Sequence, residues 1–175
     1  MNKLNLGCGN KILKGYLNVD VADLSGVNII HDLNKTPYPF KENSIEEVFC
    51  RHFLEHVDNL FFVLEEICRI SKNHSKVKII APYFSGQGAF NDPQHKRFFT
   101  YKTFDYFSQK GYYSKAKFVI LKRKIFFFSA SSFMKSKIFS IPFDFLISIC
   151  PVFYQRFLCW IFPSSEIHFL LEVIK

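Results

Sequence analysis

The segment from Leu4 to Asp20 constrains the fold of this chain more than any other. A short apolar run ends in Gly7-Cys8-Gly9, and a second apolar run ends on the acidic Asp20. This order predicts a strand, a glycine turn and a neighbouring strand with a carboxylate at its tip. In an open parallel sheet, ligands bind at the carboxyl ends of the strands, where glycine lets the backbone approach them closely. We therefore expect a ligand crevice here, with Asp20 placed to bind a ribose diol.

The hydrophobic pattern downstream predicts further short strands and one amphipathic helix. The helix is expected over 60–71, and the strands over 27–30, 45–50, 76–81, 118–121 and 166–174. A second helix is expected over 101–110. Strands that alternate with helical or looped connections predict an α/β fold with a mostly parallel sheet. A length of 175 residues is typical of one domain, which we expect to span residues 1–175.

The cysteines and the amino terminus indicate the cellular compartment in which the protein is expected. The five cysteines are scattered and odd in number, and no two of them form a CxxC pair. This argues against a disulfide framework and against a zinc knuckle. No basic and apolar leader precedes Leu4. These features predict a cytoplasmic protein.

The glycine turn has two competing interpretations. A dinucleotide-binding fingerprint requires G-x-G-x-x-G, and Ile12 stands at the position of the third glycine. What remains is a G-x-G turn, followed by Asp20 at the end of one predicted strand and Asp32 after the next. This combination favours a nucleoside-containing ligand other than a dinucleotide.

These residues resemble a small class I S-adenosylmethionine-dependent methyltransferase of the type 11 kind. The resemblance rests on residues 4–9, Asn18-Val19-Asp20, His31-Asp32-Leu33, Pro39-Phe40 with Asn43-Ser44-Ile45, and His52-Phe53-Leu54-Glu55-His56. It covers residues 3–122 well and 163–175 weakly. It implies a doubly wound, mostly parallel seven-stranded sheet, S-adenosylmethionine as the cofactor and methyl transfer as the reaction.

The resemblance also implies which residues hold the cofactor: Leu6, Gly7, Cys8, Gly9, Asp20, Asp32, Leu33, His52 and Phe53. Asp20 would bind the ribose hydroxyls, and Asp32 would accept from the adenine amino group. The segment between Gly9 and Asp20 is too short for the full helix that usually follows the glycine loop. The alternative for the glycines and the two acidic residues is a purely structural role in turns.

The segment from His52 to His56 also fits H-x-x-E-H, the inverted zinc-protease pattern. That interpretation requires both histidines inside one helix, whereas His52 directly follows a predicted strand. No acidic third ligand on a second helix is apparent in the sequence. The sequence therefore predicts no metal site and places Glu55 at the positive end of the helix that follows.

The loop after the fifth strand carries the residues expected to handle the methyl acceptor. It contains D-P-x-H-x-R-x-F-T, a pattern that recurs in similar methyltransferases. His95 is the predicted general base and Asp92 the residue that orients it, because a hydroxyl acceptor must lose its proton during methyl transfer. The predicted acceptor contacts are Tyr83, Lys96, Arg97 and Phe98. Alternatively, His95 and Arg97 only pin the loop, and positioning of the acceptor suffices for transfer.

The stretch 125–162 is apolar and aromatic, and its charged residues and prolines argue against a transmembrane helix. It is expected to form a helical insertion before the last strand. The insertion would act as a cap that closes the substrate pocket. A compatible second role is a peripheral membrane surface at the inner face of the membrane, where lysines such as Lys124, Lys135 and Lys137 meet anionic lipid.

The acceptor class is the least constrained prediction. The net charge of +8 would suit RNA, but the lysines are not arranged as in an RNA-binding module, so a nucleic acid is disfavoured. Aromatic faces stack on sugar rings, so we expect O-methylation of a small or lipid-linked saccharide, as in surface-glycan pathways. The alternatives are a SAM-binding partner or regulator without turnover, and an RNA methyltransferase.

Overall fold

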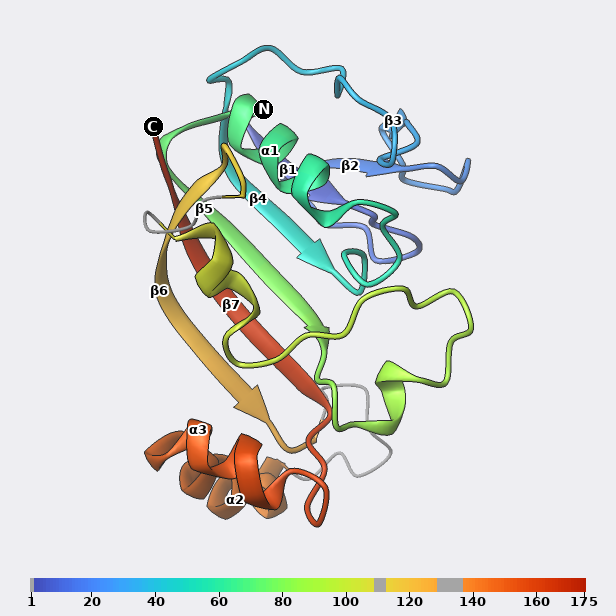
Figure 1. Ribbon diagram of the computed structural model, residues 1–175. Coiled ribbons are helices and arrows are strands. Elements are labelled where there is room, and N and C mark those ends of the chain that lie inside the picture. Colours follow the sequence, from blue (N-terminus) through green and yellow to red (C-terminus); the bar gives the residue numbers. More distant parts are fainter. Residues whose placement is uncertain (1, 109–112, 129–136) are drawn as a thin grey trace.

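A computed structural model of the chain describes residues 2–108, 113–128 and 137–175. One seven-stranded sheet organises these residues, in the order β3-β2-β1-β4-β5-β7-β6 (Figure 1). The strands are β1 Lys3–Leu6, β2 Leu17–Asp20, β3 Ile29–Ile30, β4 Ile45–Arg51, β5 Ser71–Pro82, β6 Lys117–Phe126 and β7 Glu166–Ile174. Strands β1 to β5 pair in parallel, and β7 lies antiparallel between β5 and β6. The predicted mostly parallel seven-stranded α/β sheet is confirmed.

The helix α1, Leu60–Ile70, lies across one face of the sheet (Figure 1). The Asn59 side chain caps it by accepting hydrogen bonds from the backbone N–H groups of Phe61 and Phe62. Its apolar side, including Leu64 and Ile67, is fully buried in the core. The amphipathic pattern predicted this helix to within one residue, because a regular apolar spacing and a cap residue coincide.

Loops replace helices in the connections that precede β2 and β3, so the described residues cover the sheet less completely than a doubly wound fold implies. Two buried asparagines hold the first loop in place. The Asn5 amide donates to Lys11 O and to Asn18 Oδ1, both at 2.8 Å. Asn18 Oδ1 also accepts from the backbone of Leu13 at 2.9 Å. These side-chain bonds satisfy backbone groups that a helix would otherwise pair internally.

Several element boundaries differ from the predicted ones. Strand β3 is shorter, and the expected helix 101–110 is a 3-10 turn, η2 Thr103–Phe107, with 109–112 outside the described residues. Strand β6 runs on to Phe126, which pairs with Glu166, so residues 125–126 belong to the sheet and not to the insertion. The predicted strand ended at Leu121, before a basic stretch, but an edge strand tolerates charged side chains on its exposed face.

The insertion before β7 is helical, as predicted. It comprises α2 Lys137–Ile149, α3 Pro151–Phe153 and the π-helical turn η3 Tyr154–Leu158, while residues 129–136, with Lys135, lie outside the described part. Ile147, Tyr154 and Cys159 bury it against the rest of the core. Among the described helices, none is alone long and apolar enough to cross a membrane; Ile141–Ile149 and Pro151–Leu158 pass that test only as a pair bent by 99°.

Glu47 on β4 joins three basic or phenolic groups. It accepts from Tyr16 Oη at 2.7 Å and pairs with the Nζ atoms of Lys3 and Lys78. Burial alone would raise the pKa of Glu47, but the hydrogen bonds from Lys78, Tyr16 and Lys3 outweigh it and lower the pKa to about 2. The folded state therefore stabilises the ionised form of the Glu47 carboxylate.

We expect Glu47 to make the fold acid-sensitive. Because its folded pKa lies below the ordinary value of 4.5, its stabilisation is present above that pH and is lost as the pH falls through 2. Glu47→Gln should lower the urea midpoint near pH 6 and reduce its further drop near about pH 3. The matched control is Glu46→Gln, whose exposed pair with Lys72 is screened by solvent. Equal pH profiles for wild type and Glu47→Gln would contradict this account.

Candidate functional site

A crevice of about 290 Å³ opens at the carboxyl ends of the first strands of the sheet. It is lined by Gly7, Asp20, Val21, His31, Asp32, Leu33, Asn34, His52, Phe53, His56 and Gln94. The structure therefore brings most of the predicted cofactor residues together in one place. Sequence reasoning missed the other lining residues, although His31 and Asn34 flank Asp32 and His56 ends the H-F-L-E-H segment.

Asp20 ties the glycine turn to the end of β2. Its Oδ2 accepts from the backbone N–H of Gly9 at 2.7 Å, and its Oδ1 accepts from Ala22 at 3.0 Å. Each carboxylate oxygen can accept a second hydrogen bond, and the side chain is only partly buried. Asp20 is thus oriented by the backbone and still able to bind a pair of hydroxyl groups.

The glycine turn is shaped by the ring of Phe53. Gly7 has a φ of +63°, and a Cβ atom there would lie 2.5 Å from the Phe53 ring. The turn after β4 that delivers this ring begins at His52, which itself has a φ of +49°. A non-glycine residue with positive φ is uncommon outside functional or tightly constrained positions. Only glycine at position 7 lets the ring close the floor of the crevice.

The segment after β3 forms the opposite side of the crevice. Asp32 Oδ1 accepts from the backbone of Asn34 at 3.1 Å, and the Tyr38 hydroxyl donates to Leu33 O at 2.8 Å. The Asn34 side chain accepts in turn from the backbone of Asp58 at 2.8 Å. These bonds fix the segment to the loop that follows β4, so this side of the crevice is held in a defined position.

The remaining predicted cofactor residues lie beneath the crevice. Leu6 is fully buried in β1, and Cys8 is 4% exposed. Burial, and then the charge of Asp20, raise the pKa of the Cys8 thiol. Their side chains therefore belong to the core. Any contact of Leu6, Cys8 or Gly9 with a ligand runs through the backbone.

His52 lies between two buried carboxylates. Its Nε2 is 3.2 Å from Glu166 and its Nδ1 is 3.3 Å from Glu55. Hydrogen bonds to Glu166 and Glu55 raise the pKa of His52 to about 9. Burial would raise the pKa of Glu166, but hydrogen bonds from His168 and His52 lower it to about 2. His52 is therefore an imidazolium near neutral pH, and it joins the end of β4 to the start of β7.

The predicted acceptor loop docks onto the turn after β4. The backbone N–H groups of Lys96 and Arg97 donate to Glu55 O at 2.7 and 3.1 Å. The Lys96 side chain pairs with the Asp58 carboxylate, and the Arg97 guanidinium donates to the Asp58 carbonyl. Both cations thus anchor the loop, as the structural alternative for Arg97 predicted.

Two phenylalanines of this loop face solvent. Phe98, a predicted acceptor contact, is 48% exposed and stacks on Phe90, with ring centroids 4.9 Å apart. Tyr83 differs from its prediction: it is fully buried, and its hydroxyl donates to Gln155 at 3.2 Å. Tyr83 directly follows β5 in the chain, and its side chain lies in the core, so it cannot touch an acceptor. The accessible aromatic surface of the loop is the Phe90–Phe98 pair.

His95 and Asp92 do not form the expected hydrogen-bonded dyad. Nε2 of His95 is 4.0 Å from Asp92, and the hydrogen bond that orients the ring runs from its Nδ1 to Ala89 O at 3.0 Å. Asp92 Oδ1 accepts instead from the backbone of Gln94 at 2.8 Å. The His95 ring lies against His56, with centroids 4.7 Å apart. His95 therefore reaches the crevice through His56.

The fold agrees with comparisons to known proteins. A family model described as a methyltransferase domain matches residues 4–79, which hold the glycine turn, Asp20, Asp32 and the H-F-L-E-H segment. No curated protein matches the sequence.

Solved structures of low sequence identity share the fold. The YcgJ protein from Bacillus subtilis is 12% identical, with a TM-score of 0.61 over 99% of this chain and 91% of that one. A SAM dependent methyltransferase from Archaeoglobus fulgidus is 17% identical, with a TM-score of 0.58 over 97% and 85%. A putative type 11 methyltransferase from Sulfolobus solfataricus is 15% identical, with a TM-score of 0.54 over 99% and 85%. The chain thus matches a methyltransferase domain over residues 4–79 and shares its fold with these solved structures.

Proposed function

We propose that this methyltransferase acts on a hydroxyl group of a saccharide, carried on a lipid at the cytoplasmic face of a membrane. One observation carries the proposal: the crevice that holds Asp20 adjoins a loop whose exposed aromatic pair, Phe90 and Phe98, offers a flat surface. Such a surface suits a sugar ring, because aromatic faces stack against the apolar face of a sugar.

The crevice fits S-adenosylmethionine by the chemistry of its donors. Asp20 would bind the ribose hydroxyls, Asp32 would accept from the adenine amino group, and the Leu33 backbone would contact the ring. Phe53 closes the floor above Gly7, and His52 adds a positive charge that Glu55 and Glu166 neutralise. When bound, S-adenosylmethionine supplies a methyl group already activated on sulfur, so the chain itself must mainly position the acceptor and exclude water.

The acceptor would approach from the loop 90–98, whose Gln94 lines the crevice. In this proposal Phe90 and Phe98 stack on the sugar, while Lys96 and Arg97 hold the loop in place. His95 remains part of the acceptor site, through its contact with His56 rather than through Asp92. The hydroxyl would then face the part of the crevice where His56 lies.

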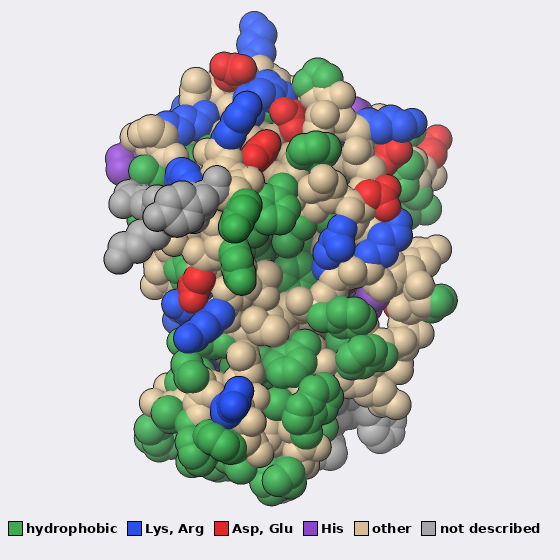
Figure 2. Space-filling model, in the orientation of Figure 1, with side chains coloured by type: hydrophobic (Ala, Val, Ile, Leu, Met, Phe, Trp, Pro, Cys, Tyr) green, Lys and Arg blue, Asp and Glu red, His purple; other side chains and the backbone are tan. Residues whose placement is uncertain are grey.

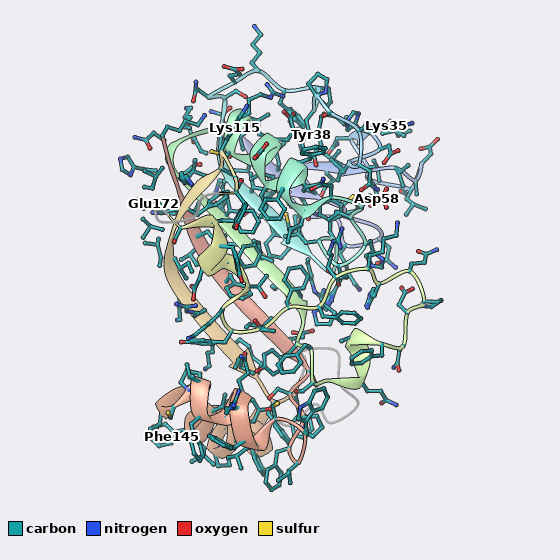
Figure 3. All side chains as sticks on the ribbon, viewed as in Figure 1. Lys35, Tyr38, Asp58, Lys115, Phe145 and Glu172 are labelled. Atoms are coloured by element: carbon teal, nitrogen blue, oxygen red, sulfur yellow. The ribbon has the colours of Figure 1, made fainter. Side chains whose placement is uncertain are left out.

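An apolar surface at one end of the molecule supports a lipid-borne acceptor. Hydrophobic side chains gather over α2 and α3 (Figure 2), and Phe145 points outward from α2 (Figure 3). The exposed members include Ile141, Phe145, Leu146, Ile149, Phe157, Trp160 and Ile161, each more than 60% exposed. The carboxyl ends of β4 and β5 point toward this end of the molecule (Figure 1). Such a surface favours shallow insertion into a bilayer.

We expect the chain to sediment with vesicles that contain anionic lipid. Phe145→Glu with Trp160→Glu should abolish most of this binding, because both side chains are 67% exposed and a charge opposes their burial in lipid. Tyr106→Glu is the matched control, since Tyr106 is 64% exposed on η2, outside the apolar surface. Binding that survives the double substitution would contradict the membrane role.

The function is tested with S-adenosylmethionine that carries an isotopic label on its methyl group. A membrane extract and total RNA are each incubated with the labelled cofactor, once with the protein and once without it. The proposal predicts label in the lipid-linked saccharide fraction, stable to mild base as an ether is. Label in RNA would instead indicate an RNA methyltransferase. No transfer to any fraction, with intact binding of S-adenosylhomocysteine, would indicate a cofactor-binding regulator.

A further inference from the structure

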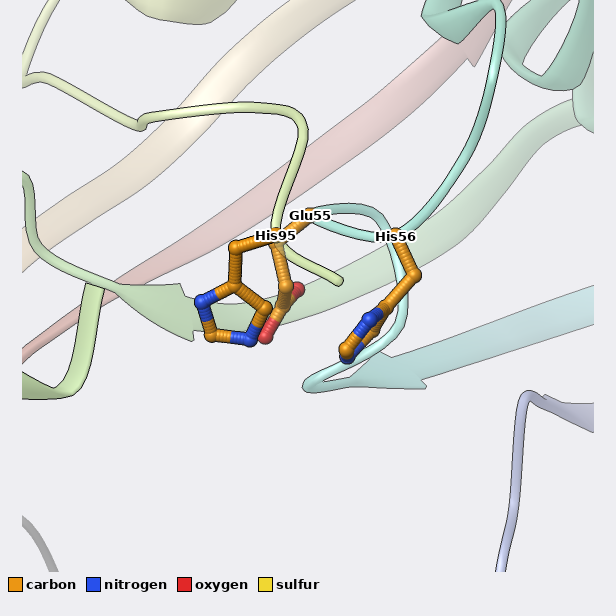
Figure 4. Close-up of side chains that lie close together, drawn as sticks. All are labelled: Glu55, His56 and His95. Carbon is orange, nitrogen blue, oxygen red and sulfur yellow. The ribbon is translucent and has the colours of Figure 1, made fainter. Parts of the chain in front are cut away.

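Glu55, His56 and His95 form a cluster that methyl transfer does not by itself require (Figure 4). One candidate ligand atom from each side chain lies within 4.8 Å of the other two. Glu55 and His56 belong to the turn after β4, and His95 comes from the acceptor loop, which docks on the Glu55 backbone. Two segments distant in sequence thus bring two imidazoles and a carboxylate to one point.

The Glu55 carboxylate is buried without being satisfied. Glu55 is 1% exposed, and its Oε1 lies 3.3 Å from His52. Its Oε2 is buried and has no hydrogen-bond partner in the part of the chain that the structure describes. A buried carboxylate oxygen without a partner costs free energy, so such an atom calls for a ligand that is not part of the chain.

The His95 ring is already oriented as a ligand would be. Its Nδ1–H donates to Ala89 O at 3.0 Å, which leaves the Nε2 lone pair free. Figure 4 shows one nitrogen of this ring turned toward the Glu55 carboxylate, with the His56 ring beside them. Metal-binding histidines commonly donate their second ring nitrogen to a carbonyl or carboxylate in this way, which fixes the tautomer.

We propose that Glu55, His56 and His95 bind a divalent transition-metal ion of the Zn²⁺ class. Two imidazoles and a carboxylate are a donor set that such ions accept while keeping a position open. Ligand atoms in a tetrahedral zinc site lie about 3.4 Å apart, so the cluster must contract from its 4.8 Å spread. His56 is only half-buried, so rotation of its ring can supply this contraction while His95 keeps its bond to Ala89 O.

The sequence did not predict this metal site, and the reason can be identified. The H-x-x-E-H pattern suggested His52 and His56 as the ligand pair, and the helix that this pair requires does not form there. The structure turns His52 toward Glu166 instead and replaces it with His95, 39 positions after His56 in the chain. The third ligand, His95, joins the other two only because the acceptor loop folds back onto the turn after β4.

The site also bears on the acceptor, a consequence that rests on the proposed function. His56 lines the cofactor crevice, so an open coordination position beside it is accessible from the acceptor side. A hydroxyl bound to a divalent cation ionises at a lower pH than a free hydroxyl. The bound hydroxyl would lose its proton to solvent water, which replaces the proton transfer to His95 that was expected.

The test measures metal binding directly and needs neither cofactor nor acceptor. The chain is dialysed against a chelator and titrated with Zn²⁺ in competition with a chromogenic zinc indicator. We expect one site per chain, with the affinity lowered at least about 100-fold in His95→Ala and in His56→Ala, since loss of even an outer partner commonly costs 10- to 100-fold. His74→Ala is the control, because His74 lies on β5 with a side chain 68% exposed.

Two results would overturn the site. One is the absence of stoichiometric Zn²⁺ binding by the wild type, and the other is equal affinity in wild type and His95→Ala. Thermal unfolding shows whether each variant is folded, and His95→Ala is preferred to Glu55→Gln because Glu55 is the more buried side chain. Binding of S-adenosylhomocysteine is measured on the same samples, so failure of the metal site and failure of the cofactor site are distinguished.

Discussion

Asp20→Ala is expected to lower the affinity for S-adenosylhomocysteine by about 100-fold or more. The carboxylate would lose its hydrogen bonds to the ribose hydroxyls, and hydrogen bonds to a charged group contribute about 1.5–3 kcal/mol each. The substitution also removes the bonds from Gly9 and Ala22, which hold the glycine turn against β2. Calorimetric titration of the variant and the wild type measures this ratio.

The control for this prediction is Asp23→Ala. Asp23 is an exposed carboxylate three residues further along the same connection, and it does not line the crevice. Its removal changes the net charge by the same amount, so it reports any general electrostatic effect. Equal losses of affinity in the two variants would remove the ribose-binding role of Asp20.

Gly7→Ala is expected to destabilise the fold by about 2–5 kcal/mol and to weaken cofactor binding more than about tenfold. An L-residue with φ near +63° costs about 1–2 kcal/mol, and overpacking against a ring typically adds about 1–3 kcal/mol. The displaced ring is Phe53, which lines the crevice, so the loss of affinity follows from the same clash. Urea unfolding and calorimetry give the two quantities.

Gly9→Ala separates the two causes. Gly9 has a φ of +48°, but no atom lies within 4 Å of the Cβ position, so only the backbone cost of about 1–2 kcal/mol is expected. The double variant Gly7→Ala with Phe53→Ala should unfold at a higher urea concentration than a sum of the two single effects predicts. If Gly7→Ala and Gly9→Ala behave alike, the contact with Phe53 does not constrain the turn.

The sheet could be predicted from the sequence because its signals are local. A glycine turn, an acidic strand tip and a capped amphipathic helix each have their own pattern, and β1, β2, α1 and β7 follow these patterns closely. The lack of a full helix between Gly9 and Asp20 was also expected, since that segment is too short for one. What was missed is the pairing of Phe126 with Glu166, because long-range pairing gives no signal in a basic stretch.

The features of the candidate site were likewise predictable only where a local pattern encodes them. Asp20 and Asp32 were placed in one crevice by their positions at strand ends and Phe53 by the family resemblance, and the structure brings all three together there. The partners of His95 and the burial of Tyr83 were not predictable, since they depend on how the acceptor loop and the insertion fold back. Residues on loops are positioned by contacts distant in sequence, which a local pattern does not encode.

The central claim is that the crevice at the carboxyl ends of β1 to β4 binds S-adenosylmethionine. Calorimetric titration of the wild-type chain with S-adenosylhomocysteine, the product form of the cofactor, tests it most directly. We predict saturable binding with one site per chain. Heats no larger than those of dilution, from a chain shown to be folded by circular dichroism, would contradict the claim.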